Sequence, residues 1–301
     1  HSALMIASQS GLPNCIQTLY QCFGDELDPN LLSDDLCTAL MLAAKFGYFE
    51  CIIVLYECFG KKLNCKVVND DKHNVLMLAA KRGFSQCIKA LYDCFGDKLD
   101  CNAVDVNGHT ALMLASSEQH SECIEVLHEC FGDKLSYAPN TPENKCTSLL
   151  CVAKNGFSSK CIATLIKRFR DKLDYNGFDE DGYNMLLYAT IYGSQESIQM
   201  LCELSDGELN CNVVDKDLRN PLMIAAQDGA FELVELLYDC FGDKLDCNAC
   251  DINENTALMI ATDQGHSECI LTLYNCFGDK LNYNALNNSQ RSAFMLAVAQ
   301  G

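Results

Sequence analysis

The sequence predicts an all-α solenoid, built from stacked helix–turn–helix units with protruding hairpin loops. A leucine within an Ala-Leu-Met-like triplet recurs every 36 or 37 residues. A glycine stands seven residues after this anchor in eight of nine units, with Gln119 as the exception. A fixed period of this length indicates a repeat architecture rather than a single globular core. The anchors are Leu4, Leu40, Leu76, Leu112, Leu149, Leu186, Leu222, Leu258 and, in the ninth place, Phe294.

Each unit should begin with a short helix. Thr110 is a residue type that caps helix N-termini, and an apolar pattern starts at Leu112 and breaks near Gln119. This length predicts a helix of about two turns.

A second, longer helix should follow. Apolar residues from Cys123 to Phe131 follow 3/4 spacing, and Gly132 can supply the left-handed position that ends a helix. The polar stretch that joins one unit to the next contains Asp105 to Gly108, in which Asn-Gly favours a tight reversal. A hairpin loop is expected there.

The segment from Asp105 to Ala115 resembles the signature of the ankyrin-repeat family, in which a hairpin tip leads into Thr-Pro-Leu-His-x-Ala. Gly265-His266 is similar to the family's step between its antiparallel helices, and Pro221 matches the family's proline. Three features depart from the family pattern: Met or Leu fills the usual His position, the period exceeds 33, and Cys-Phe-Gly-Asp-Lys-Leu closes the second helix. We expect the three extra residues to add nearly one turn to that helix.

The repeat frame predicts one solenoid of about eight repeats over residues 1–301. A discontinuity is expected around 136–207, where residues are inserted and Arg168-Phe-Arg170 and Leu204-Ser-Asp206 replace Cys-Phe-Gly. The sequence starts within a first helix at His1 and stops at the mid-repeat Gly301, without polar capping units. We therefore expect a piece of a longer protein, truncated at both ends.

The composition disfavours two classes of partner. A formal charge of −19 repels nucleic acid phosphates and anionic lipids, and no apolar run approaches the length that spans a bilayer. Most of the 21 cysteines fall at helical core positions where an aliphatic residue would also fit. Equivalent positions on stacked helices are too far apart for disulfides, so we expect reduced thiols and a cytoplasmic location.

Catalysis and cofactor binding find little support in the sequence. His120-x-x-Cys123 and His266-x-x-Cys269 could suggest a cysteine hydrolase, but each Cys is better explained as a core residue. Cys247-x-x-Cys250 has zinc-knuckle spacing without a second pair, and no phosphate-binding loop is present. We predict no enzyme activity, no cofactor and no metal.

The resemblance implies a binding surface on the concave side, formed by hairpin tips and first helices. We expect the strongest contact at Tyr183, Ile191 and Tyr192, with flanking cations that set association rates. Ordinary charge scatter on a solvated face, and intramolecular packing of Ile191 and Tyr192, are the alternatives. The candidate residues are Phe46, His73, Lys81, Arg82, His109, Lys154, Tyr183, Ile191, Tyr192 and Arg219.

The function predicted from these observations is a scaffold or adaptor segment that binds a protein partner of unknown identity. The alternatives are the cytoplasmic ankyrin region of a membrane channel or kinase, and a structural cytoskeletal rod.

Overall fold

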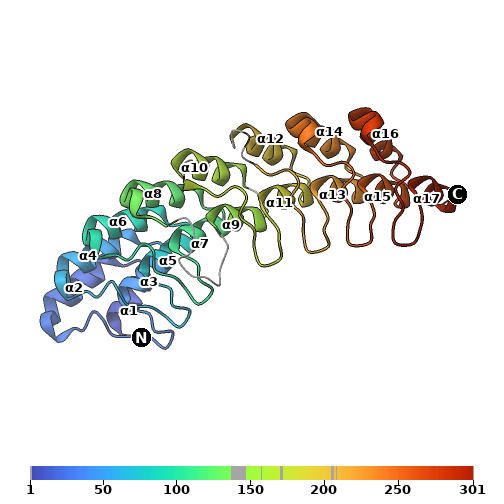
Figure 1. Ribbon diagram of the computed structural model, residues 1–301. Helices are drawn as coiled ribbons and strands as arrows, with labels where there is room; N and C mark the ends of the chain where they lie inside the picture. The colour runs from blue at the N-terminus through green and yellow to red at the C-terminus, as the bar shows by residue number, and fades with distance from the viewer. Residues whose placement is uncertain are drawn as a thin grey trace. The chain divides into compact units, whose positions relative to one another are not determined.

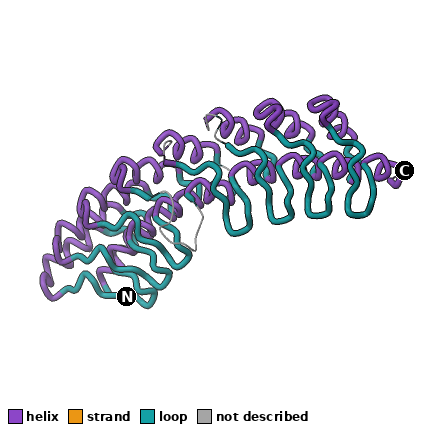
Figure 2. Tube along the Cα trace, viewed as in Figure 1, coloured by secondary structure: helices purple, strands orange, loops and turns teal. Residues whose placement is uncertain are grey.

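The computed structural model describes residues 2–136, 147–156, 158–169, 172–204, 207 and 209–300, and within these it contains helices and loops but no strand. Figure 1 shows the paired helices, and Figure 2 shows the loops between them. The all-α repeat fold predicted from the sequence is confirmed. No helix of the described residues is long and apolar enough to cross a membrane.

The chain separates into two compact units, one of residues 1–155 and 160–173 and one of residues 156–159 and 174–301. The single solenoid with a discontinuity around 136–207 stays a prediction. Unit 1 contains α1 (Ala3–Gln9), α2 (Pro13–Phe23), η1 (Gly24–Glu26), α3 (Ala39–Phe46), α4 (Phe49–Phe59), η2 (Gly60–Lys62), α5 (Val75–Lys81), α6 (Ser85–Phe95), η3 (Gly96–Lys98), α7 (Ala111–Ser117), α8 (Ser121–Phe131), η4 (Gly132–Lys134), α9 (Ser148–Lys154) and most of α10 (Ser159–Phe169). Unit 2 contains α11 (Met185–Ile191), α12 (Gln195–Leu204), α13 (Pro221–Gln227), α14 (Phe231–Phe241), η6 (Gly242–Lys244), α15 (Ala257–Asp263), α16 (Ser267–Phe277), η7 (Gly278–Lys280) and α17 (Ala293–Gln300).

The first helix of each repeat begins at the predicted cap. Thr110 Oγ1 accepts a hydrogen bond from Met113 N at 3.3 Å, and Asn220 Oδ1 accepts one from Met223 N at 2.9 Å. Such a cap satisfies one of the backbone donors that a helix N-terminus leaves unpaired. The two-turn helix expected after Thr110 is α7.

At Gly83, both the backbone conformation and the packing require a glycine between the helices. Gly83 has a φ of +79°, and a Cβ placed there would lie 2.8 Å from the His120 ring of the next repeat. Gln119 takes this position in its own repeat with a φ of +60°, a left-handed conformation that is costly for a residue with a side chain. The exception seen in the sequence is therefore a strained residue in the same turn.

The second helix ends differently from our expectation. The helix α8 stops at Phe131, and the next three residues form the separate 3-10 turn η4, so the extra residues of the repeat do not lengthen the helix. Gly132 has the expected positive φ, +52°, but its ψ of −128° lies outside the left-handed helical region. The glycine redirects the chain, which explains why the turn is not continuous with α8.

The hairpin loops are shaped by one side chain in each repeat. Asp105 Oδ1 accepts hydrogen bonds from Asn107 N and His109 N, both at 2.8 Å. Asp215 does the same for Asp217 N and Arg219 N. This arrangement lets a short polar side chain replace backbone pairing in a tight turn.

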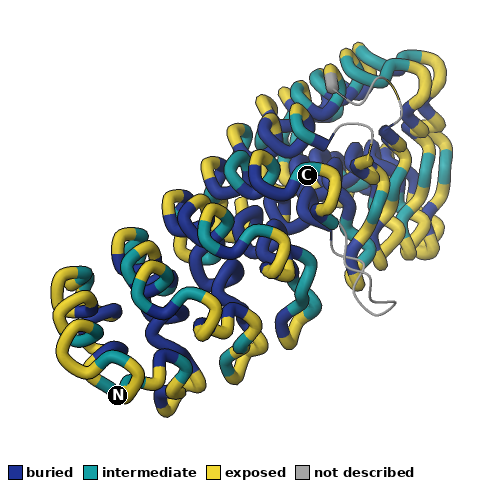
Figure 3. The backbone as a smooth tube through the Cα atoms, turned by 90° about the vertical axis from the view of Figure 1, so that its left-hand side faces the viewer, coloured by how far each residue is buried: buried dark blue, intermediate teal, exposed yellow. Residues whose placement is uncertain are grey.

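The helices bury one continuous apolar layer within each unit, and Figure 3 shows exposed residues concentrated on the loop tips and outer turns. The anchors Leu76 and Leu112 are fully buried. Cys87 and Cys123 are also fully buried, and burial raises the pKa of both thiols to about 12. Every cysteine of the described residues is a free thiol, although Cys15 of α2 is exposed.

Candidate partner-binding surface

In unit 2, three tyrosines of one repeat form a stack. The ring centroids of Tyr183 and Tyr188 lie 5.3 Å apart, and those of Tyr188 and Tyr192 lie 6.3 Å apart. Tyr188 is buried, and its hydroxyl donates a hydrogen bond to Asp179 Oδ2 at 2.7 Å. Burial, followed by this bond to a carboxylate, raises the pKa of Tyr188. The buried ring of Tyr188, which is uncharged and hydrogen-bonded, therefore holds the stack in place.

The residues predicted as the strongest contact lie at the solvent side of this stack. Ile191 is 39% exposed and Tyr192 is 48% exposed, while Tyr183 is half-buried. Tyr188 was missed by the sequence reasoning, which considered only the residue before each cap and the last two before each glycine. We call Tyr183, Tyr188, Ile191 and Tyr192 the tyrosine patch.

Arg219 belongs to the next repeat and is held in a fixed position. Its guanidinium contacts Asp215 Oδ2 through Nε at 2.9 Å and through Nη2 at 2.8 Å, and its Nη1 donates to Gln227 Oε1 at 2.9 Å. Gln227 is the repeat equivalent of Ile191. In this repeat, the residue before the helix cap therefore contacts a residue at the end of the first helix.

A polar groove of about 410 Å³ lies next to Arg219 in unit 2. It is lined by Asn255, Asp263 and, further along, Arg291. Its amide and charged groups can hydrogen-bond to a polypeptide, whereas the tyrosine patch offers apolar contact.

In unit 1, the structure changes the interpretation of His73. The side chain is buried, with Nε2 at 3.4 Å from Asp105 Oδ2, and burial, followed by the charge of Lys81, lowers its pKa. His109, from the next repeat, lies near the same oxygen, with Nδ1 at 3.7 Å from Asp105 Oδ2. His73 therefore packs between two hairpins, and we leave it out of the candidate surface.

The other candidates of unit 1 lie at the ends of first helices. Phe46 is 39% exposed, with Lys45 Nζ 6.0 Å from its ring centre. Lys81 is half-buried, and Arg82 and Lys154 are exposed. These cations belong to a different unit from the tyrosine patch, so their role as its flank stays a prediction.

The residues considered for chemistry occupy structural positions. Cys123 and Cys269 are fully buried, and burial raises the pKa of Cys269 to about 11, which keeps it protonated. Cys247 is buried while Cys250 is exposed. Among the described residues there is no group of three or more His, Cys, Asp or Glu side chains that could hold a metal ion.

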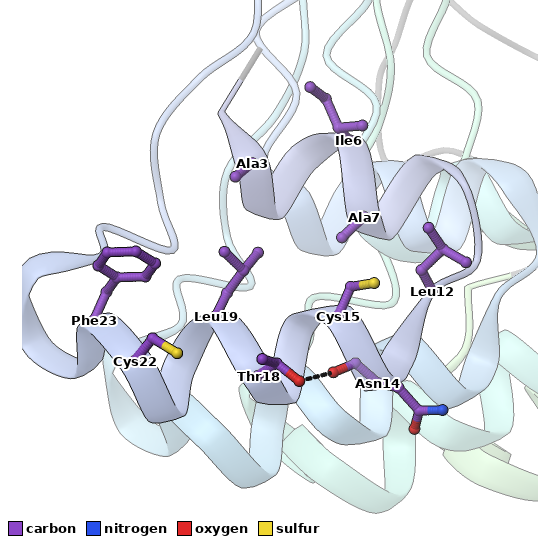
Figure 4. Close-up of a pocket in the computed structure, with 10 residues that line it drawn as sticks. All are labelled: Ala3, Ile6, Ala7, Leu12, Asn14, Cys15, Thr18, Leu19, Cys22 and Phe23. Atoms are coloured by element: carbon purple, nitrogen blue, oxygen red, sulfur yellow. Dashed lines mark hydrogen bonds between the residues drawn. The ribbon is translucent and has the colours of Figure 1, made fainter.

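An apolar pocket of about 530 Å³ lies between α1 and α2 (Figure 4). Phe23, which lines it, is 51% exposed, whereas its equivalent Phe59 is 5% exposed because a neighbouring repeat covers it. Cys15 and the buried Cys51 differ in the same way. The pocket therefore lies on a face of α1 and α2 that corresponds to a covered face in the next repeat.

Comparison with known proteins agrees with this repeat architecture. No curated protein matches the chain. The family described as "Ankyrin repeats (3 copies)" matches residues 1–67, 57–138 and 203–285, which together cover more than half of the sequence. Stacked helix pairs, hairpin loops and this match together show that the chain belongs to the ankyrin-repeat family.

Proposed function

We propose that this protein-interaction module is a scaffold or adaptor segment, and that it holds its partner at the tyrosine patch of unit 2. The observation that carries the proposal is the exposed pair Ile191 and Tyr192 above a buried, hydrogen-bonded Tyr188. Large side chains already held in place lose little conformational entropy on binding, and such residues concentrate interface energy. Arg219 and the adjoining groove supply polar contacts beside them.

The proposed setting is the reducing interior of a cell. Support comes from the twenty free thiols of the described residues, many of them on neighbouring helices. If the chain is instead the ankyrin region of a channel or kinase, it would bind its partner through the same surface. A structural rod would tolerate substitution of that surface.

The test compares two exposed tyrosines of unit 2. Tyr192→Ala should remove the partner, with a loss of about 2 kcal/mol or more in binding, because it truncates the proposed anchor. Tyr274→Ala is the matched control, since Tyr274 is 62% exposed on the second helix α16. Quantitative capture from cell extract and thermal melting would be measured for both variants.

The proposal predicts that one set of proteins is lost with Tyr192→Ala and retained with Tyr274→Ala, while both variants melt like the wild type. If Tyr192→Ala retains every captured protein, the contact surface lies elsewhere. Early unfolding of Tyr192→Ala would instead show that the ring packs within the repeat, in which case Ile191→Ser tests the surface.

A further inference from the structure

The hairpin tips of the first three repeats expose apolar side chains beside carboxylates. Leu32 is 50% exposed, Val68 is 41% exposed and Val106 is 56% exposed. Between them lie two exposed aspartate pairs, one in each of the first two tips. We call this set the tip patch; its members are Leu32, Val68, Val106, Asp34, Asp35, Asp70 and Asp71.

Neighbouring hairpins of unit 1 are held side by side by hydrogen bonds (Figure 2). Asn30 Nδ2 donates to the carbonyl of Lys62 at 2.7 Å, and Asn30 Oδ1 accepts from Asn64 N at 2.8 Å. At the tips, Val106 N donates to the carbonyl of Asp71 at 3.1 Å. The apolar and acidic side chains of the tip patch therefore come from adjacent loops in one fixed row.

Carboxylates outnumber cations in the tip patch, because Lys72, which follows Asp71, is the one lysine or arginine within the two tips that carry its four aspartates. Elsewhere in unit 1, aspartates near the 3-10 turns pair with a lysine of the next repeat, as Asp97 does with Lys134 at 2.5 Å. Asp34, Asp35 and Asp70 form no ion pair with the part of the chain that the structure describes. Asp71 Oδ2 lies 3.7 Å from His73 Nδ1, but that imidazole has a lowered pKa and is uncharged near neutral pH.

One hairpin of unit 2 has the same apolar exposure with its charge balanced. Val214 is 40% exposed, and Asp217 Oδ2 lies 3.6 Å from the guanidinium of Arg219. Lys216 of the same tip pairs with Asp181 at 2.7 Å. The excess of free carboxylates beside exposed apolar residues therefore distinguishes the tip patch from this hairpin.

We propose that the tip patch docks a basic amphipathic segment of a partner protein. Leu32, Val68 and Val106 contact the apolar face of the segment, and its flanking Lys or Arg side chains pair with the four aspartates. An amphipathic helix presents such a stripe between charged flanks. Opposite charges at the rim favour this partner class and disfavour acidic ones. The inference concerns a different surface from the tyrosine patch and does not rest on it.

The test uses two synthetic helical peptides that share one leucine stripe, one with lysine and one with glutamate at every polar position. Fluorescence anisotropy with the whole chain should show that the lysine peptide binds at least about tenfold more tightly. The triple variant Asp34→Asn, Asp35→Asn, Asp70→Asn should weaken its binding about tenfold and reduce the salt dependence. The double variant Leu32→Ser, Val68→Ser should also weaken binding.

Two controls separate docking from the attraction of any acidic protein for a cation. Glu50→Gln, Glu57→Gln, Glu122→Gln removes the same number of charges from exposed positions on the second helices of unit 1. Val214→Ser removes an equally exposed apolar side chain in unit 2. Both controls, and Tyr192→Ala, should leave the affinity for the lysine peptide within about twofold of the wild type.

Circular dichroism would establish that every variant keeps its helical content. The inference is overturned if the glutamine control weakens binding as much as the tip variant does. It is equally overturned if the two peptides bind alike, or if Val214→Ser or Tyr192→Ala has the larger effect.

Discussion

The second-helix layers of the two units are held together differently. In unit 1, four edge-to-face ring pairs link successive repeats, with centroids 5.0 to 5.1 Å apart: Tyr20–Phe59, Tyr56–Phe95, Tyr92–Phe131 and His128–Phe169. In the described residues of unit 2, only Tyr238–Phe277 makes this contact. Cys202 stands where most other repeats place Tyr or His, with Ile166 as the other exception, and its thiol contacts that of Cys240.

This difference shows that the repeat backbone does not need the ring pair, although the strength of coupling between repeats should depend on it. An edge-to-face pair contributes about 0.5–1.5 kcal/mol beyond the area it buries. In a repeat array, stability is carried by such nearest-neighbour terms. We expect α12 and α14 to be coupled less strongly than α4 and α6.

The largest effect should come from removing a phenylalanine ring that has an edge-to-face partner. The comparison is with removing a phenylalanine ring that lacks such a partner among the described residues. Phe95→Ala should destabilise unit 1 by about 3–5 kcal/mol, because the ring is buried and contacts Tyr56. Phe241→Ala should cost less, since Phe241 is half-buried and Cys202 occupies its partner's position. Denaturant unfolding would measure both. Equal losses would contradict the proposed difference in coupling.

The asparagine links between repeats should have the same strength in both units. Asn102 Nδ2 donates to the carbonyl of Lys134 at 2.6 Å, and Asn212 Nδ2 donates to that of Lys244 at 2.7 Å. Either Asn→Ala change should cost about 1 kcal/mol, because each removes exposed bonds to the next repeat. Lys66→Ala, at the equivalent position, is the control and should change the free energy of unfolding by less than about 0.5 kcal/mol. A larger loss of stability in one unit would show that the two units also differ in the hydrogen bonds between their loops.

Adding the missing ring should strengthen the weaker layer. Cys202→Tyr should stabilise unit 2 by about 0.5–1.5 kcal/mol, because the new ring can pack edge-to-face on Phe241. Hydrogen exchange should show slower opening of α12 and α14 than in the wild type. Cys202→Ser is the matched control, which adds no ring. A lower melting temperature for the tyrosine variant would show that α12 cannot accommodate the side chain.

The smallest effect concerns the strained turn of unit 1. Gln119→Gly should stabilise the protein by about 0.5 kcal/mol, because glycine adopts the φ of +60° without the penalty of a Cβ. The gain is partly offset by the loss of the hydrogen bond from Gln119 Nε2 to the carbonyl of Asn155. Gly83→Ala should have the opposite sign, since its Cβ would collide with His120. Thermal melting would contradict this account if both changes had the same sign.

Much of the repeat frame could be predicted from the sequence because period, capping residue and glycine are local signals. Thr110 and the core leucines occupy the positions that the pattern assigned. The burial of His73 depends on Asp105 of the next repeat, which no pattern within one repeat reveals. The separate 3-10 turn depends on the ψ of Gly132, although its positive φ could be anticipated.

The candidate surface was predictable in part for the same reason. Tyr183 and Tyr192 were found because the pattern marks which positions face the loops. Tyr188 was missed because it fills a position that in most other repeats holds an aliphatic core residue, and its contact with Asp179 becomes visible only in three dimensions. The exposed valines of the tip patch escaped notice because apolar residues in a loop give no periodic signal.

One further consequence comes from the side chain that shapes each hairpin. Asp105, Asp215 and most of their equivalents hold the turn by accepting two backbone hydrogen bonds, and Asn69 accepts one, although the residues at the tip differ. The residues at the tip can therefore be substituted during evolution without a change in the loop conformation. Successive copies of a duplicated repeat can in this way acquire different binding specificities. The tip dipeptides already differ widely along the chain: Asp70-Asp71, Val106-Asn107, Glu180-Asp181, Lys216-Asp217, Ile252-Asn253 and Asn288-Ser289.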